Sequence, residues 1–228
     1  MSRHAVRLFL ISIVLLTTAC AAGKIGKREA PSYEGKAFGE VLSERNGIHD
    51  IETKFAVLFE KKDSEIRGDA ALDISRSGDM SLRVYSLGFL AMELTSKDGV
   101  IKSNPILDRG KKLILTRGLR DCLYWWDSED LSLSEGNEHY MLTGQDRELW
   151  IDKKTFLPYR QNIYFEDGKV LKVYYDSPAE EDGFWYQSRI RIEFLQYSVT
   201  FTIKHMAFKS KSAGAGLTIP VPDLPQRS

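Results

Sequence analysis

The feature that most constrains the fold is an alternation of apolar and polar side chains that recurs in segment after segment from Ile51 to Lys209. Successive side chains of a strand point to opposite faces of a sheet, so a period of two predicts strands with one apolar face. Turn signals separate the segments, most clearly Lys97-Asp98-Gly99 and Asp167-Gly168. The pattern predicts about eleven antiparallel strands that follow one another as hairpins.

Two segments interrupt this alternation. Residues 33–47 place Phe38, Val41 and Leu42 at helical spacing and predict a short helix before the first strand. Residues 104–137, which contain a proline and several glycines, predict one or two short helices after the fifth strand. A long antiparallel sheet must curl, and a helix can fill its concave side. The expected fold is mainly β with helices: an unclosed antiparallel barrel whose concave face is plugged by the N-terminal helix and the helical insertion.

The start of the chain has the order of a secretory signal. Arg3 and Arg7 come first, an apolar run follows over residues 8–16, and small residues lead up to Ala19. A basic start, a short apolar run and small residues before a cleavage point predict a signal peptide over residues 1–19. The apolar run is too short for a stable transmembrane helix, which needs about 20 residues.

Cys20 stands directly after this predicted signal peptide. The arrangement resembles the lipobox of bacterial lipoproteins, which implies a diacylglycerol on the sulfur and a further acyl chain, such as palmitate, on Cys20. Thr17 departs from the leucine usual in that motif. Ala21 stands where lipoproteins retained in the inner membrane often have aspartate, so the resemblance implies the outer membrane, facing the periplasm. The alternative is an ordinary secreted protein cut after Ala19, with an incidental cysteine.

Charge and composition limit the partners. The whole chain has no net charge, and loss of Arg3 and Arg7 with the signal leaves 30 basic against 32 acidic residues. Without a basic excess to neutralise phosphates, a nucleic-acid partner is not expected. We expect residues 20–32 to form a lipidated tether, residues 33–209 one domain, and residues 210–228 a flexible tail.

Enzyme signatures are weak. The histidines after the signal peptide, His49, His139 and His205, are not spaced as metal ligands, and no nucleophile-elbow or phosphate-loop motif occurs. Cys122 has no expected disulfide partner, and a buried apolar role is favoured over a catalytic thiol. We therefore predict no enzyme, no metal and no cofactor beyond the acyl groups on Cys20.

One local segment carries a resemblance to a known family. Tyr85 to Thr95, followed by Lys97-Asp98-Gly99, resembles a Pro-Leu-Gly turn and its following strand in the lipoprotein-sorting LolA/LolB family, with Ser86 in place of the proline. The strand order, the opening helix and the insertion after the fifth strand also fit over residues 33–209. The resemblance implies an unclosed barrel of eleven strands whose apolar cavity receives acyl chains.

The resemblance also assigns roles to residues. It implies that Leu87, Gly88 and Phe89 form a loop that inserts delivered lipoproteins into the membrane; the alternative is that both apolar side chains turn inward and cap the core. Arg76 corresponds to an arginine of the soluble carrier, although the proline that should follow it is missing.

A hydrophobic cavity is expected on the concave face, and the alternative is a core filled by the same side chains. The cavity residues would be Phe55, Val57, Phe59, Leu72, Leu82, Val84, Met92 and Leu94. The aromatic run Tyr124-Trp125-Trp126 is expected to pack as a lid over this face, or else to face the bilayer.

The resulting hypothesis is a monomeric outer-membrane lipoprotein that binds acyl chains and takes part in lipoprotein or lipid localisation, as a transport factor or chaperone. Its partners would be membrane lipid and either an acylated lipoprotein cargo or its periplasmic carrier. The alternative hypothesis is a non-enzymatic envelope scaffold that binds a protein partner through a sheet edge or its tail.

Overall fold

The computed structural model describes residues 31, 33, 35–62, 64–127 and 130–210. The predicted signal peptide, Cys20, almost all of the tether and the tail after Ser210 lie outside the described residues, so the expectations for them stay predictions. Among the described residues, no helix is both long and apolar enough to cross a membrane.

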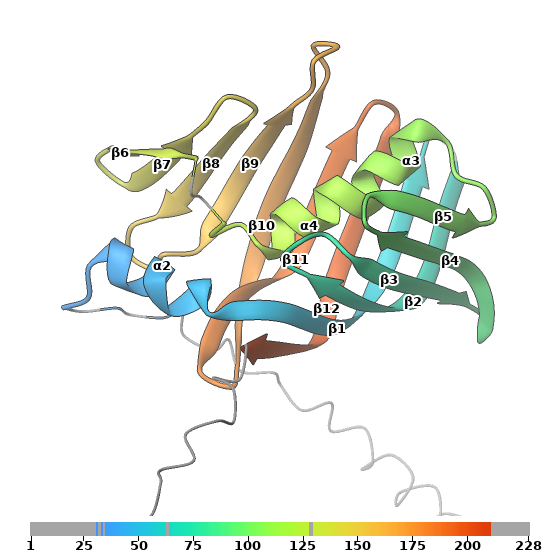
Figure 1. Cartoon of the computed structure of the whole chain (residues 1–228), viewed down its shortest axis with the longest axis horizontal. Coiled ribbons are helices and arrows are strands. Elements are labelled where there is room, and N and C mark those ends of the chain that lie inside the picture. Colours follow the sequence, from blue (N-terminus) through green and yellow to red (C-terminus); the bar gives the residue numbers. More distant parts are fainter. Residues whose placement is uncertain (1–30, 32, 34, 63, 128–129, 211–228) are drawn as a thin grey trace, which may run out of the picture.

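Twelve antiparallel strands form one sheet in the described part of the chain (Figure 1). The first five are β1 (Ile48–Lys61), β2 (Ser64–Ser75), β3 (Met80–Ser86), β4 (Phe89–Lys97) and β5 (Val100–Asn104). The other seven are β6 (Ser132–Glu135), β7 (His139–Thr143), β8 (Arg147–Asp152), β9 (Pro158–Tyr164), β10 (Val170–Glu181), β11 (Phe184–Phe194) and β12 (Tyr197–Ser210).

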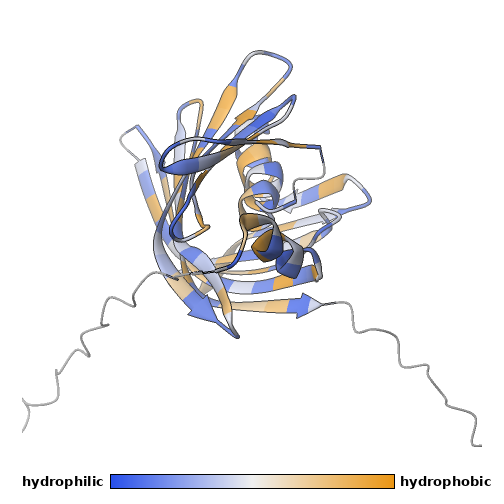
Figure 2. Ribbon diagram, turned by 90° about the vertical axis from the view of Figure 1, so that its left-hand side faces the viewer, coloured by the Kyte–Doolittle hydropathy of each residue, from blue (hydrophilic) through white to orange (hydrophobic). Residues whose placement is uncertain are grey.

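The strand order is β5-β4-β3-β2-β1-β12-β11-β10-β9-β8-β7-β6, so the first and last strands pair in the middle and β5 and β6 form the two edges. The chain passes between these edges through the helical insertion. Figure 2 shows the strands curling around that insertion, with the two edges left apart. The predicted unclosed antiparallel barrel is confirmed.

The sequence pattern missed one strand. β6 is a four-residue edge strand with every side chain exposed, so it has no buried apolar face to produce a recognisable alternation. The structure also ends β12 at Ser210, one residue beyond the expected end. Both differences lie at the margins of the sheet, where burial does not dictate residue type.

Helices occur at the two predicted places. α2 (Phe38–Asn46) precedes the sheet, and it begins at Phe38 because the Glu40 carboxylate accepts a hydrogen bond from the Ala37 amide at 3.0 Å. The insertion is one continuous helical segment made of α3 (Arg109–Leu113), a π-helical turn η1 (Ile114–Gly118) and α4 (Leu119–Leu123). The Asp108 carboxylate caps its start by accepting from the Lys111 amide at 3.0 Å.

Two glycines set the position of this insertion over the sheet. A Cβ added at Gly110 would meet the Tyr197 ring at 3.0 Å, and one at Gly118 would meet the side chains of Ile192 and Leu171 at 3.3 Å. Glycine at these two positions lets the backbone approach without displacing those side chains. The insertion therefore lies close to β10, β11 and β12 at Gly110 and Gly118.

Candidate functional site: an apolar cavity beneath the helical insertion

An apolar cavity of about 230 Å³ lies between the insertion and strands β1 to β4 and β12. Most of its lining is apolar, and its polar members are Arg67, Ser86 and Lys111. From the sheet it is lined by Phe55, Val57, Phe59, Ile66, Gly68, Leu82, Val84, Ala91, Met92, Val199 and Phe201. From the segment that covers it, Pro105, Leu107 and Leu115 complete the wall.

The eight residues expected to form a cavity divide into two groups. Phe55, Val57, Phe59, Leu82, Val84 and Met92 line the apolar cavity. Leu72 and Leu94 do not line it; both are fully packed in the core. Because neighbouring strands bring the first group onto one face, period-two spacing was enough to find them.

The cavity is large enough to hold a small piece of hydrocarbon. An apolar void of roughly 150 Å³ can stay dry and bind benzene. Sites for drug-sized ligands usually have roughly 300–1,000 Å³. The volume here therefore fits part of one acyl chain rather than several chains.

The turn between β3 and β4 is fully exposed. Leu87 is 95% exposed and Phe89 is 78% exposed. Leu87 and Gly88 both have positive φ angles, 52° and 81°, which makes the tight two-residue turn that matches the twist of antiparallel strands. The inward-facing alternative for these side chains is excluded by their exposure, whereas membrane insertion stays a prediction.

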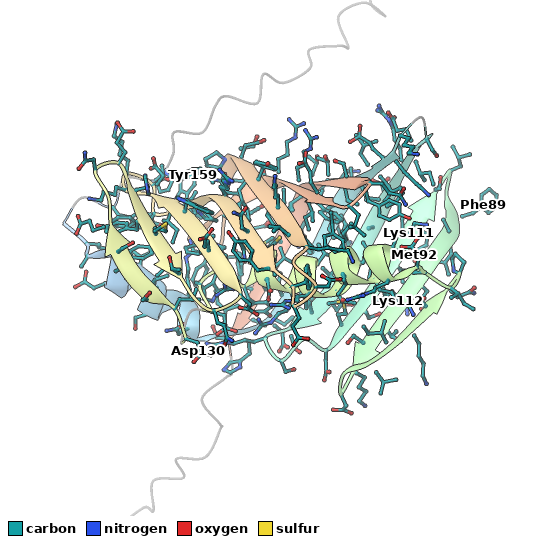
Figure 3. The ribbon with its side chains drawn as sticks, turned by 90° about the horizontal axis from the view of Figure 1, so that it is seen from above. Phe89, Met92, Lys111, Lys112, Asp130 and Tyr159 are labelled. Atoms are coloured by element: carbon teal, nitrogen blue, oxygen red, sulfur yellow. The ribbon has the colours of Figure 1, made fainter. Side chains whose placement is uncertain are left out.

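Exposed apolar side chains gather around this cavity. Eleven large apolar side chains are exposed among the described residues, and six of them line the cavity or lie within two residues of a lining residue. The six are Ile66, Tyr85, Leu87, Phe89, Leu90 and Ile106. We call this set the apolar rim. Figure 3 shows Phe89 projecting from the end of the molecule that also holds Met92 and Lys111. Clusters of this kind on a protein surface usually mark an interaction site.

The other half of the concave side is packed solid. Tyr124, Trp125 and Trp126 are all buried, and the Tyr124 hydroxyl donates to the carbonyls of His49 and Ile74 at 2.8 and 2.9 Å. Only about 10 Å³ stays free around the two tryptophans. The aromatic run is thus an internal lid, and the bilayer-facing alternative is wrong.

A buried arginine completes this packed half. The Arg45 guanidinium lies 5.1 and 5.2 Å from the ring centroids of Trp125 and Trp126 and donates to the Trp185 carbonyl at 2.6 Å. Burial lowers the pKa of Arg45 from its usual value. The cation joins α2 to the aromatic lid through cation–π contacts.

An ion-pair network fastens the end of the insertion to the sheet. Asp127 accepts hydrogen bonds from Arg76 at 2.8 Å and from Arg120 at 2.5 Å, and the Arg147 guanidinium donates to its backbone carbonyl. Arg120 also donates to the Arg76 carbonyl at 3.2 Å. Burial acts to raise the pKa of Asp127, but the hydrogen bond from Arg76 and the arginine charges outweigh it, so the pKa is lowered. Sequence reasoning singled out Arg76 but missed Asp127.

Cys122 and possible metal ligands are the remaining candidates for chemistry. Cys122 is buried, and burial raises the pKa of its thiol far above the usual range, so it is not a thiolate at neutral pH. The described residues contain no group of histidine, cysteine and carboxylate side chains arranged to hold a metal.

The fold and cavity define an open antiparallel half-barrel with a helical plug. Comparison with family profiles and with the sequences of curated proteins gives no match. Among solved structures, the chain is similar to a LolA superfamily protein from Nitrosomonas europaea, with a TM-score of 0.51 at 14% identity over 77% of this chain and 94% of that one.

Two further solved structures are similar to the chain. One is a DUF1329 family protein from Desulfovibrio piger, with a TM-score of 0.50 at 11% identity, over 75% of this chain and 90% of that one. Another is an outer membrane lipoprotein-sorting protein domain from Vibrio parahaemolyticus, with a TM-score of 0.44 at 12% identity, over 75% and 92%. The first two likenesses show the fold, and the LolA/LolB-like resemblance drawn from the sequence is confirmed at that level.

Proposed function

We propose that this protein is a non-enzymatic outer-membrane lipoprotein that takes an acyl chain into the apolar cavity and takes part in localising lipoproteins or lipids. Its anchor would be the acylated Cys20, and it would face the periplasm. The observation that carries the proposal is that a cavity suited to hydrocarbon lies beside the apolar rim. The likeness to a LolA superfamily protein and the matched turn at Leu87 support the same conclusion.

The proposed cycle of acyl-chain binding and release needs no covalent step. Burial of apolar surface contributes roughly 25 cal/mol per Å², so a chain that enters the apolar cavity from water is stabilised. Leu87 and Phe89 leave water when they enter a bilayer, and this brings the cavity beside the lipid. Release follows because the bilayer competes for the same hydrocarbon.

The test uses two matched leucines. Leu87 and Leu195 both occupy two-residue hairpin turns with positive φ, 52° and 56°. In a Cys20→Ala background, which removes any attached lipid, Leu87→Glu should abolish flotation with phosphatidylethanolamine–phosphatidylglycerol vesicles, whereas Leu195→Glu should retain it. Equal flotation of the two variants would contradict the proposed role of the turn.

A second candidate function rests on the sheet edges. β6 has an unpaired edge and four exposed side chains, including Leu133, so it could accept a strand from a protein partner. This scaffold role is separable in cells. The Leu133 N–H points away from β7, because hydrogen-bonded pairs alternate along β6 from the Gly136–His139 pair. Leu133→Pro would therefore block strand addition at β6 without touching the cavity, and loss of function with Leu133→Pro but not with Leu87→Glu would favour the scaffold.

A further inference from the structure

We infer that the apolar cavity selects acyl chains that carry an anionic head, a carboxylate or a phosphate, with Lys111 receiving that head at the mouth. The inference rests on the proposed acyl-binding function and names its class of ligand. It starts from the charges in the cavity wall: Lys111 is a charged side chain on the insertion that covers the cavity, and no carboxylate lines it. Arg67 also borders the cavity, but it pairs with Leu58 across β1 and β2, so its side chain points to the opposite face of the sheet.

A polar cleft beside α4 differs from the apolar cavity in the charges of its wall. It is larger, about 780 Å³, and its wall mixes three arginines with six aspartates. The aspartates are Asp79, Asp98, Asp121, Asp127, Asp130 and Asp146. An anionic ligand would be repelled there, whereas the mouth of the apolar cavity offers it only positive charge from the lining itself.

Lys111 is held where a headgroup would lie. It lies one helical turn from Leu115, so an apolar side chain and a cation share the face of the insertion that covers the cavity. Its ammonium lies 5.7 Å from the centre of the Phe59 ring and 5.6 Å from that of Tyr197. These rings stabilise the cation away from bulk water, where its attraction to an anion is stronger.

Lys111 keeps donors free for a ligand. The Lys111 ammonium lies 3.3 Å from one Asp108 oxygen, and an ammonium has three N–H donors. A partly satisfied cation at an apolar mouth suits one anionic head on one chain.

The experiment measures displacement of the neutral apolar dye N-phenyl-1-naphthylamine from the full chain carrying Cys20→Ala. Competitors share one chain length and differ in the head: dodecanoate, monolauroyl phosphatidylglycerol, dodecanol and dodecyltrimethylammonium. We expect the two anions to bind about tenfold or more tightly than the cationic amphiphile, as one charge-assisted hydrogen bond would give. Comparison of dodecanoate with monolauroyl phosphatidylglycerol distinguishes a free fatty acid from a phospholipid as the preferred ligand.

The variants assign the preference to residues. Lys111→Gln should reduce the preference for anions, whereas Lys112→Gln, a neighbouring lysine outside the lining, should keep it. Equal binding of all heads, or a preference that survives in Lys111→Gln, would overturn the inference and leave acyl binding intact. Failure of every amphiphile to displace the dye would overturn both the inference and the proposed function.

Discussion

The two halves of the concave side differ in how completely the helical insertion fills them. Around Trp125 and Trp126 only about 10 Å³ is free, whereas around Phe55 and Met92 the free volume is about 230 Å³. The same insertion covers both. It lies close to β10, β11 and β12 at Gly110 and Gly118.

This comparison shows how one helical segment can serve stability and binding together. Bulky aromatic rings and the buried Arg45 fill the packed half, as close-packed protein interiors require. Val57, Val84 and Ala91 line the open half together with larger side chains such as Phe55 and Met92, and the residues of the apolar rim line it or are its near neighbours in the chain. The packed half holds the insertion in place so that the open half stays open.

The largest effect is expected in the packed half. Trp126→Ala removes a ring that is only 2% exposed and leaves a void among aromatic neighbours, so it should lower the free energy of unfolding by about 3–5 kcal/mol. Urea denaturation followed by far-ultraviolet circular dichroism measures this. A loss no greater than that of Met92→Ala would break the comparison between the halves.

The ion-pair network should give the next largest effect. Asp127→Asn removes the charge that Arg76 and Arg120 share and should cost about 1–3 kcal/mol at neutral pH. The lowered pKa of Asp127 means that its contribution is complete above the unfolded value of about 4 and is lost as the pH falls through the folded value. Denaturation of both proteins across the acidic range should therefore show the difference shrinking; a constant difference would argue against this linkage.

Met92→Ala should have a smaller effect. Its side chain is half-buried and already borders free volume, so its removal creates little new unfavourable void. We expect a loss below the roughly 2 kcal/mol that marks the low end for fully packed core residues. Urea denaturation beside the Trp126→Ala protein provides the measurement, and a loss above that value would mean that the open half is more tightly packed than the cavity implies.

The smallest effect on stability is expected at the rim. Leu87→Glu replaces a side chain that is 95% exposed, so the free energy of unfolding should change by no more than about 0.5 kcal/mol. Thermal unfolding checks this directly. A large loss would show that Leu87 supports the fold, and the vesicle experiment could then not be interpreted as loss of membrane contact.

The sequence predicted the sheet because alternation is a direct consequence of one buried face, and six of the eight expected cavity residues followed from it. It could not predict the free volume, since that depends on where Gly110 and Gly118 place the insertion. Asp127 was missed for a related reason: its partner Arg76 lies 51 residues earlier and meets it only in the folded chain. The edge strand β6 buries nothing, so its composition carried no signal.

The most direct test is a substitution that fills the apolar cavity in the open half of the concave side. Val57 lines the apolar cavity, while Leu58, the next residue of β1, is not part of the lining and points to the other face of the sheet. Dye displacement by dodecanoate should be lost in Val57→Phe and unchanged in Leu58→Phe, with both proteins folded. Undiminished binding in Val57→Phe would contradict the claim that hydrocarbon enters this cavity.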